Sequence, residues 1–190
     1  MTMMKTIDAA PIAGTDRAAV ARLRSYYAIR ALVSGLWVAA AFLVGATSPI
    51  AAAILLVAYP AWDAVANLID GARSGGLAQN RPQAINVIVS ALTAVAVAIS
   101  LADTATVVRL FGIWAIVAGL LQLATGVARW KTYKAQWAMI LSGAQSALAG
   151  GFFIKQSLGP AMPAVTTVAP YAALGALYFL VSALLLLRRR

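Results

Sequence analysis

Three polar side chains follow one face of an otherwise apolar stretch: Asp63, Asn67 and Asp70. Their spacing of i, i+4 and i+7 places them on one stripe if the stretch is an α-helix. Carboxylates and amides at membrane depth are the groups from which proton relays and ion pathways are built. We therefore take these three residues as the candidate proton or polar site.

Asp63 lies deeper in this stretch than Asp70, where a charged carboxylate costs roughly 2.5–3.5 kcal/mol. It must be protonated, reached by a water-filled cavity, or paired with another group. Two interpretations follow: a polar clasp that holds two helices together, or a proton-responsive group hydrogen-bonded to Asn67. For Asp70, near the end of the stretch, we expect an ion pair with Arg73, three residues further on.

Three more polar side chains lie inside apolar stretches: Arg109, Gln122 and Gln145. We expect Arg109 to extend outward toward Asp103, as long cationic side chains do near helix ends. A gating or anion-contact role for Arg109 is the alternative. Gln122 and Gln145 are candidates for hydrogen bonds between helices.

Several kinds of chemistry are excluded because the chain has no cysteine and no histidine. Disulfides, thiolate catalysis, Ser–His proteolysis and zinc sites built from the usual ligands all need one or the other. Asp63 and Asp70 lie about two turns apart on one helix, so they cannot form an aspartate dyad within one chain. No phosphate-binding loop, metalloprotease or nucleophile-elbow motif occurs. We expect a non-enzymatic protein with no cofactor and no metal.

The composition indicates a membrane protein. The chain of 190 residues is 63% hydrophobic and 11% charged, against roughly 25% charged residues in soluble domains. Six apolar stretches of about 20 residues predict six transmembrane helices surrounded by the lipid bilayer. The predicted spans cover residues 29–46, 50–70, 84–102, 105–127, 137–153 and 165–187.

The positive charge is distributed as expected for a multi-pass protein. A net charge of +10 would suggest a nucleic-acid partner in a soluble protein, but no basic stripe with interleaved aromatics occurs, so we expect none. If the chain alternates across the membrane, only Arg109 and Lys155 fall on the side away from the termini. The positive-inside rule then predicts a multi-pass membrane protein with both termini cytoplasmic. The other basic residues are Lys5, Arg17, Arg22, Arg24, Arg30, Arg73, Arg81, Arg129, Lys131, Lys134, Arg188, Arg189 and Arg190.

Residues 1–26 form a basic leader ahead of a transmembrane domain that covers residues 27–190. A cleaved signal peptide is the alternative for the first span, although the leader is long for one. We expect residues 1–14 to be disordered and a helix to follow, capped by Thr15. Three apolar or aromatic residues of this helix recur at helical spacing, namely Val20, Leu23 and Tyr27. They predict an apolar stripe at the membrane interface. A positively charged anchor is the simplest role for the leader, and specific lipid recognition is the alternative.

The even-numbered spans share one pattern and the odd-numbered spans share another. The even-numbered segments are 62–70 (WDAVANLID), 114–122 (WAIVAGLLQ) and 178–186 (YFLVSALLL). The odd-numbered segments are 32–35 (LVSG), 88–91 (IVSA) and 140–143 (ILSG). Two matched series in the same order predict three helical-hairpin repeats at about residues 27–73, 82–129 and 136–190. Because every hairpin enters from the same side, the repeats are parallel and predict a pseudo-threefold six-helix bundle.

These repeats resemble the HdeD family of small bacterial inner-membrane proteins. The likeness rests on the segments VSGL (33–36), WAIVAGLLQL (114–123) and LSGAQSALAGG (141–151), and it covers about residues 27–190. The resemblance implies a role in acid-stress resistance and brings no catalytic residue with it. The polar stripe of residues 63–70 departs from a purely apolar pattern.

Small residues recur along two predicted spans. The fourth span repeats glycine every seven residues and the fifth repeats a small residue every four, at Gly112, Gly119 and Gly126 and at Ser142, Ser146 and Gly150. Small residues at such spacing let two helix backbones approach closely, so we expect helix-packing seams. Ser48 and Pro49 predict the N-cap and first residue of the second span.

Three functions remain open on the sequence. The first is a non-enzymatic inner-membrane protein of envelope or acid-stress tolerance. The second is a small transporter or proton-conducting channel that uses the polar stripe of the second span. The third is a scaffold that associates with itself or with another membrane protein. A polar cavity that reaches Asp63 would favour transport, whereas a sealed core with an exposed glycine seam would favour partner binding.

Overall fold

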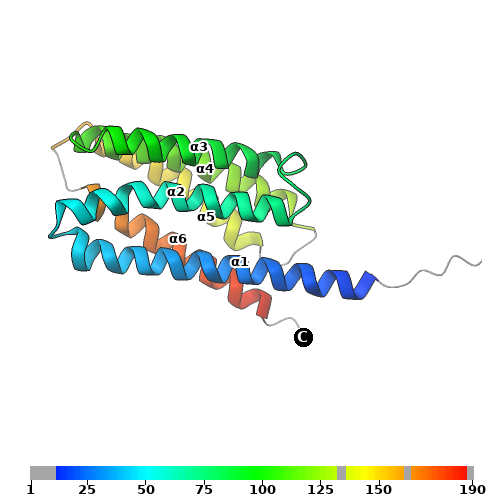
Figure 1. Ribbon diagram of the computed structural model, residues 1–190. Coiled ribbons are helices and arrows are strands. Elements are labelled where there is room, and N and C mark those ends of the chain that lie inside the picture. The colour runs from blue at the N-terminus through cyan, green and yellow to red at the C-terminus, as the bar shows by residue number, and fades with distance from the viewer. Residues whose placement is uncertain (1–11, 132–135, 161–163, 188–190) are drawn as a thin grey trace, which may run out of the picture.

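The computed structural model describes residues 12–131, 136–160 and 164–187, and this part of the chain forms a bundle of long helices without strands (Figure 1). A short π-helical segment, η1 (Ala41–Gly45), continues the first helix. The six long helices are α1 (Ile12–Ala40), α2 (Pro49–Arg73), α3 (Arg81–Ile99), α4 (Thr104–Ala128), α5 (Gln136–Gln156) and α6 (Ala164–Leu187).

The six helices confirm the predicted fold class. Each is long and apolar enough to cross a membrane, and each overlaps one predicted span. Large apolar side chains point outward from the bundle: Ile99 is 82% exposed and Leu148 is 77% exposed. Such a surface is costly in water and favourable in lipid, so the chain is built as a multi-pass membrane protein.

The first helix is longer than the sequence predicted. It begins at Ile12, so Thr15 lies inside the helix and the prediction of an N-cap there was wrong. The expectation of disorder fails for residues 12–14, which are helical, and residues 1–11 lie outside the described part of the chain. Because α1 is continuous through residues 26 and 27, it contains the proposed junction between leader and membrane domain, which stays a prediction.

The apolar stripe of the leader packs on protein rather than on lipid headgroups, which corrects the prediction. Leu23 and Tyr27 are 7% and 2% exposed. They belong to a cluster of buried apolar residues whose other members are Met139 of α5 and, from α6, Phe179, Ala183 and Leu186. The segment of α1 around Leu23 and Tyr27 is therefore fixed by burial, mainly against α6.

Local sequence sets the helix ends. Ser48 caps α2 as predicted, because its hydroxyl accepts a hydrogen bond from the Ala51 N–H at 3.3 Å and Pro49 follows at the first helical position. After α2 the chain turns through Gly75 and Gly76, whose φ angles of 97° and 93° favour glycine. Asp103 caps α4 by accepting from the N–H groups at the start of that helix.

The helices close into a ring. The most extensive contacts join α4 to α5, α1 to α6 and α2 to α3, with looser contacts between α3 and α4 and between α5 and α6. Figure 1 shows the last helix lying along the first, with the start of α1 and the end of α6 at one end of the bundle. We call the end of the bundle where α1 starts and α6 ends the basic end. The alternation of close and loose pairs is what a pseudo-threefold bundle requires, and the threefold repeat itself stays a prediction.

The two predicted seams face each other, and together they join α4 to α5. A Cβ added at Gly119 would lie 2.6 Å from the carbonyl oxygen of Gly143, and one at Gly126 would lie 3.0 Å from Ile140 Cγ1. The Ser146 hydroxyl donates to the Ala115 carbonyl across the same contact at 2.9 Å. Backbones this close leave no room for larger side chains, and the seam is inside the bundle rather than exposed for a partner.

Gly150 and Gly151 offer a matched test of this seam, because they are neighbours on α5. A Cβ at Gly150 would overlap the carbonyl oxygen of Gly112 and lie 2.7 Å from Ile116 Cγ1, whereas one at Gly151 would meet nothing within 4 Å. We expect Gly150→Ala to destabilise the protein by about 1–3 kcal/mol, or several degrees in Tm. Gly151→Ala should leave thermal unfolding in detergent unchanged or slightly improved. Equal Tm values for the two variants would contradict the seam.

Candidate functional site

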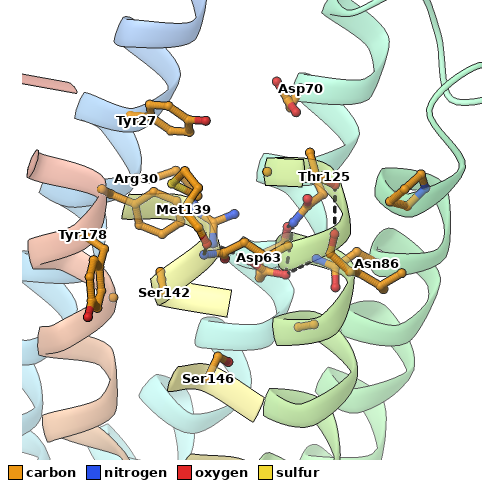
Figure 2. A pocket seen from close by; sticks show the side chains of 18 of the residues that line it. Tyr27, Arg30, Asp63, Asp70, Asn86, Thr125, Met139, Ser142, Ser146 and Tyr178 are labelled. Atoms are coloured by element: carbon orange, nitrogen blue, oxygen red, sulfur yellow. Dashed lines mark hydrogen bonds and ion pairs between the residues drawn. The ribbon is translucent and has the colours of Figure 1, made fainter. Parts of the chain in front are cut away.

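A polar cavity lies inside the bundle, toward the basic end, and all six helices line it (Figure 2). Its volume is about 80 Å³, measured as the space that the centres of water molecules can occupy. A buried water needs roughly 10–15 Å³ on this measure, so the cavity has room for several. Most of the lining groups are amides, hydroxyls and paired charges.

The Asp63 carboxylate lies at the centre of the site and is 6% exposed. Its Oδ1 accepts a hydrogen bond from the Arg30 guanidinium of α1 at 2.5 Å. Its Oδ2 accepts from Asn67 of its own helix at 3.1 Å and from two α3 side chains, Asn86 at 2.7 Å and Ser90 at 2.8 Å. Figure 2 shows Asp63 with Arg30 on one side and Asn86 on the other.

All four partners of Asp63 donate hydrogen bonds. An ionised carboxylate accepts from every side, whereas a protonated one would need an acceptor for its own O–H. The arrangement therefore fits the charged form, held by one cation and three neutral donors. The sequence analysis required Asp63 to be protonated, reached by water or paired with another group. In the structure it is paired with Arg30 and also lines the cavity.

Arg30 is the functional residue whose place the sequence analysis missed, because it was counted among the basic residues that flank the spans. Its side chain is 11% exposed and its guanidinium lies 4.4 Å from the ring centroid of Phe179 on α6. The pair thus connects α1, α2 and α6. A signal was present: Leu23, Tyr27, Arg30, Ser34 and Trp37 follow the alternating three- and four-residue spacing of one helix face, and every other member of that face is buried.

A polar stripe on α3 was missed as well. It consists of four buried residues that recur at three- and four-residue spacing: Gln83, Asn86, Ser90 and Thr93. Ser90 extends the site toward α4, because its hydroxyl accepts from Trp114 Nε1 at 2.9 Å while donating to Asp63. A run of polar residues along one face of an apolar helix is the pattern that singled out residues 63–70, so the same reasoning could have found it.

Asp70 pairs with Arg129, which follows α4, at 2.9 Å and accepts from Gln83 at 3.2 Å. The expected partner Arg73 was therefore wrong, and the reason is geometric. Asp70 is 7% exposed and faces the bundle, whereas Arg73 lies on the exposed side of the same helix. The ion pair lies at the basic end of the cavity.

A second hollow adjoins the cavity at this ion pair. This basic cleft has a volume of about 470 Å³, and it shares Tyr26, Asp70 and Arg129 with the cavity. Its outer wall carries two exposed arginines, Arg22 and Arg73. The Asp70–Arg129 pair thus lies between the cavity and the surface of the basic end.

Aromatic side chains close the other end of the cavity. Tyr59, Trp114 and Tyr171 line the cavity, with ring centroids 5.7 Å apart for the first two and 6.3 Å apart for the last two. Behind them lies the main apolar core, which includes Val97, Val168 and other fully buried residues. Among the described residues, the lining of the cavity ends at this aromatic layer.

Arg109 is not part of the cavity. It is exposed at the end opposite the basic end, and its Nε donates to the Ser157 hydroxyl at 3.4 Å rather than to Asp103. Asp103 is occupied as the N-cap of α4, and the hydrogen bonds from Thr106 lower the pKa of its carboxyl below the ordinary value. The expected direct pairing of Arg109 with Asp103 is therefore not formed.

Three seam residues, Gly126 among them, and both glutamines contribute to the cavity wall. Ser142 and Ser146 line it beside the α4 contact, and Ser146 is bonded to the Tyr171 hydroxyl at 2.8 Å. Both predicted hydrogen bonds between helices are present. Gln122 donates to the Met139 carbonyl at 3.3 Å, and Gln145 accepts from the Tyr178 hydroxyl at 2.7 Å.

A family model described as a short repeat of unknown function (DUF308) matches residues 84–155, which run from α3 into α5. The chain is similar to that family over this segment, less than half of its length. The family includes HdeD-like membrane proteins. None of the curated proteins and none of the solved structures compared with the chain matches it. Among the described residues, no group of three acidic side chains could hold a metal ion.

The Arg30–Asp63 pair can be tested by a double-mutant cycle. We expect Arg30→Met and Asp63→Leu each to destabilise the protein by about 3–5 kcal/mol, because each leaves a buried charge without its counter-ion. The double variant should lose clearly less than the sum of the two, measured as the shift of Tm in detergent. Arg109→Met combined with Asp63→Leu is the control pair and should be additive, because Arg109 lies at the opposite end of the bundle and does not line the cavity. Additive losses at Arg30 and Asp63 would show that the two charges do not depend on each other.

Proposed function

We propose that this protein is a non-enzymatic membrane carrier that binds a small polar solute in its central cavity. The observation that carries the proposal is the cavity itself. It is polar, it reaches Asp63, and it adjoins a cleft at one end of the bundle while an aromatic layer and an apolar core close the other. A polar cavity at Asp63 is the feature that separates transport from partner binding.

A carrier fits this arrangement better than an open channel. A channel needs a continuous path, whereas this cavity ends at Tyr59, Trp114 and Tyr171. A carrier exposes its site to one side at a time, through rocking of one part of the bundle against another. We assign this conformation to the state that opens toward the basic end. The positive-inside rule supports a cytoplasmic location for that end.

A scaffold role has less support. The seam that the sequence singled out for close helix contact is used inside the bundle, between α4 and α5. It is therefore not available to a second membrane protein or to a second copy of the chain.

The cellular setting that we propose is envelope or acid-stress tolerance in the bacterial inner membrane. The support is the resemblance of the repeats to the HdeD family and the family match over residues 84–155. A carrier of small polar solutes suits such a role, because the solute balance of the cell changes under acid or osmotic stress.

Sided labelling tests the access that the proposal requires. The chain has no cysteine, so single cysteines can be introduced without altering native thiols. We expect Ser142→Cys, on the cavity wall, to react with a small membrane-impermeant thiol reagent faster from the cytoplasmic side than from the outside. Val168→Cys, in the apolar core, should stay unreactive from both sides. A Ser142→Cys variant that is inert from both sides would refute the cavity as a binding site.

Flux through proteoliposomes tests the transport step. We expect native protein to speed the entry of at least one small solute from a panel of glycerol, acetamide, acetate and ethylammonium. Gly175 lines the cavity, and a Cβ there would come no closer than 3.9 Å to the Tyr59 hydroxyl oxygen, so a larger side chain can enter the cavity. Gly175→Leu should reduce the flux at least about tenfold by filling the binding space, and the outward-facing Gly151→Leu should not. Flux equal to that of protein-free vesicles for every solute would overturn the proposal.

A further inference from the structure

We propose that the central cavity accepts small uncharged molecules that carry both hydrogen-bond donors and acceptors, the class of short amides and polyols. This inference rests on the proposed function, and it names the substrate class of the same cavity. Three features of the lining carry it: the charge balance, the unpartnered polar atoms and the size.

The charges that line the cavity cancel in pairs. Arg30 and Asp63 form one pair at 2.5 Å, and Arg129 and Asp70 form the other at 2.9 Å. The other side chains of the lining are neutral. An ion that enters would find no free counter-charge, and moving an ion out of water without one is among the most costly steps in a protein.

Several buried polar atoms have no hydrogen-bond partner among the described residues, and two of opposite kind belong to side chains that hold Asp63. Asn86 is 6% exposed; its Nδ2 donates to Asp63, and its Oδ1 accepts from no group. The Arg30 Nε donates to no group, although its NH2 nitrogen is bonded to Asp63. Both residues line the cavity. A ligand that completes them must donate to one and accept from the other, as an amide or a hydroxyl compound does.

The size of the cavity sets the scale of the ligand. The space of about 80 Å³ holds several waters at roughly 10–15 Å³ each. It matches a molecule of a few heavy atoms whose polar groups replace those waters. Tyr59, Trp114 and Tyr171 give such a molecule an apolar surface to lie against.

The entrance adds a further selection. The basic cleft carries Arg22, Arg73 and Arg129 against one acidic residue, Asp70. Its positive field repels cations and attracts anions to the surface. Anions that reach the cavity meet the closed Arg30–Asp63 pair, so the neutral interior rather than the entrance decides the class of solute.

Protection of an engineered thiol measures binding without requiring flux. Ser142→Cys protein in detergent at pH 8 is labelled with N-ethylmaleimide in the presence of one of three probes of similar size: acetamide, acetate or ethylammonium. We expect acetamide to slow labelling at concentrations at least about tenfold lower than acetate or ethylammonium, because only acetamide binds without an uncompensated charge. Glycerol should protect as acetamide does. Equal or better protection by either ion would overturn the inference.

Two reciprocal variants make the test independent of any single substitution. Asp70→Asn gives the lining a net positive charge and Arg129→Gln gives it a net negative charge. We expect the first to gain protection by acetate and the second to gain protection by ethylammonium, while acetamide protects both. If neither variant changes the preference among the ions, charge balance does not set the selectivity and the inference fails.

The two proposals fail in different ways. An unreactive Ser142→Cys thiol and the absence of flux for every solute would remove the proposed function. A reactive thiol and measurable flux, with an ion as the preferred ligand, would leave the carrier in place and remove only the uncharged substrate class.

Discussion

The ionised carboxylate of Asp63 constrains how the helices of this bundle can be arranged. Burying an ion costs several kcal/mol, and this cost is recovered only if every partner is held in place. Its direct donors come from α1, α2 and α3, and Ser90 connects it onward to Trp114 of α4. The Arg30 cation in turn lies over Phe179 of α6. A shift of any one of these helices would leave a charge or a polar group facing apolar surroundings.

The two kinds of helix contact explain why the cavity lies where it does. Along α4 and α5, small residues bring the backbones together and leave no space. On α2 and α3, several buried positions that line the cavity carry amides and carboxylates, which hydrogen-bond to one another between the two helices. At Gly175 no side chain enters the space. The cavity is therefore bounded by a rigid seam on one side and by a hydrogen-bonded network on the other.

The sequence predicted those features that depend on local spacing. Six spans, the N-cap at Ser48 and the two small-residue seams follow from short-range periodicity or from turn chemistry, and the structure has them. That the two seams face each other is a tertiary contact that the sequence analysis did not predict. The partners of the two buried acids depend on tertiary contacts instead. Arg30 is 33 residues from Asp63, and Arg129 is 59 residues from Asp70. Counting basic residues by their distance from a span end assigned both arginines to the membrane surface, whereas the register of each helix face decides which side chains point inward.

The energetics of the site favour a role beyond holding the helices together. A buried ion pair can often be replaced by apolar side chains of similar volume with no loss of stability. Asn86 Oδ1 and Arg30 Nε belong to cavity-lining residues and have no partner among the described residues, and each such buried atom costs about 1–3 kcal/mol. That free energy is recovered when water or a solute completes the hydrogen bonds. The protein is therefore more stable when water or a solute occupies the cavity. A solute can be released again only if its binding free energy is comparable to that of the waters that replace it.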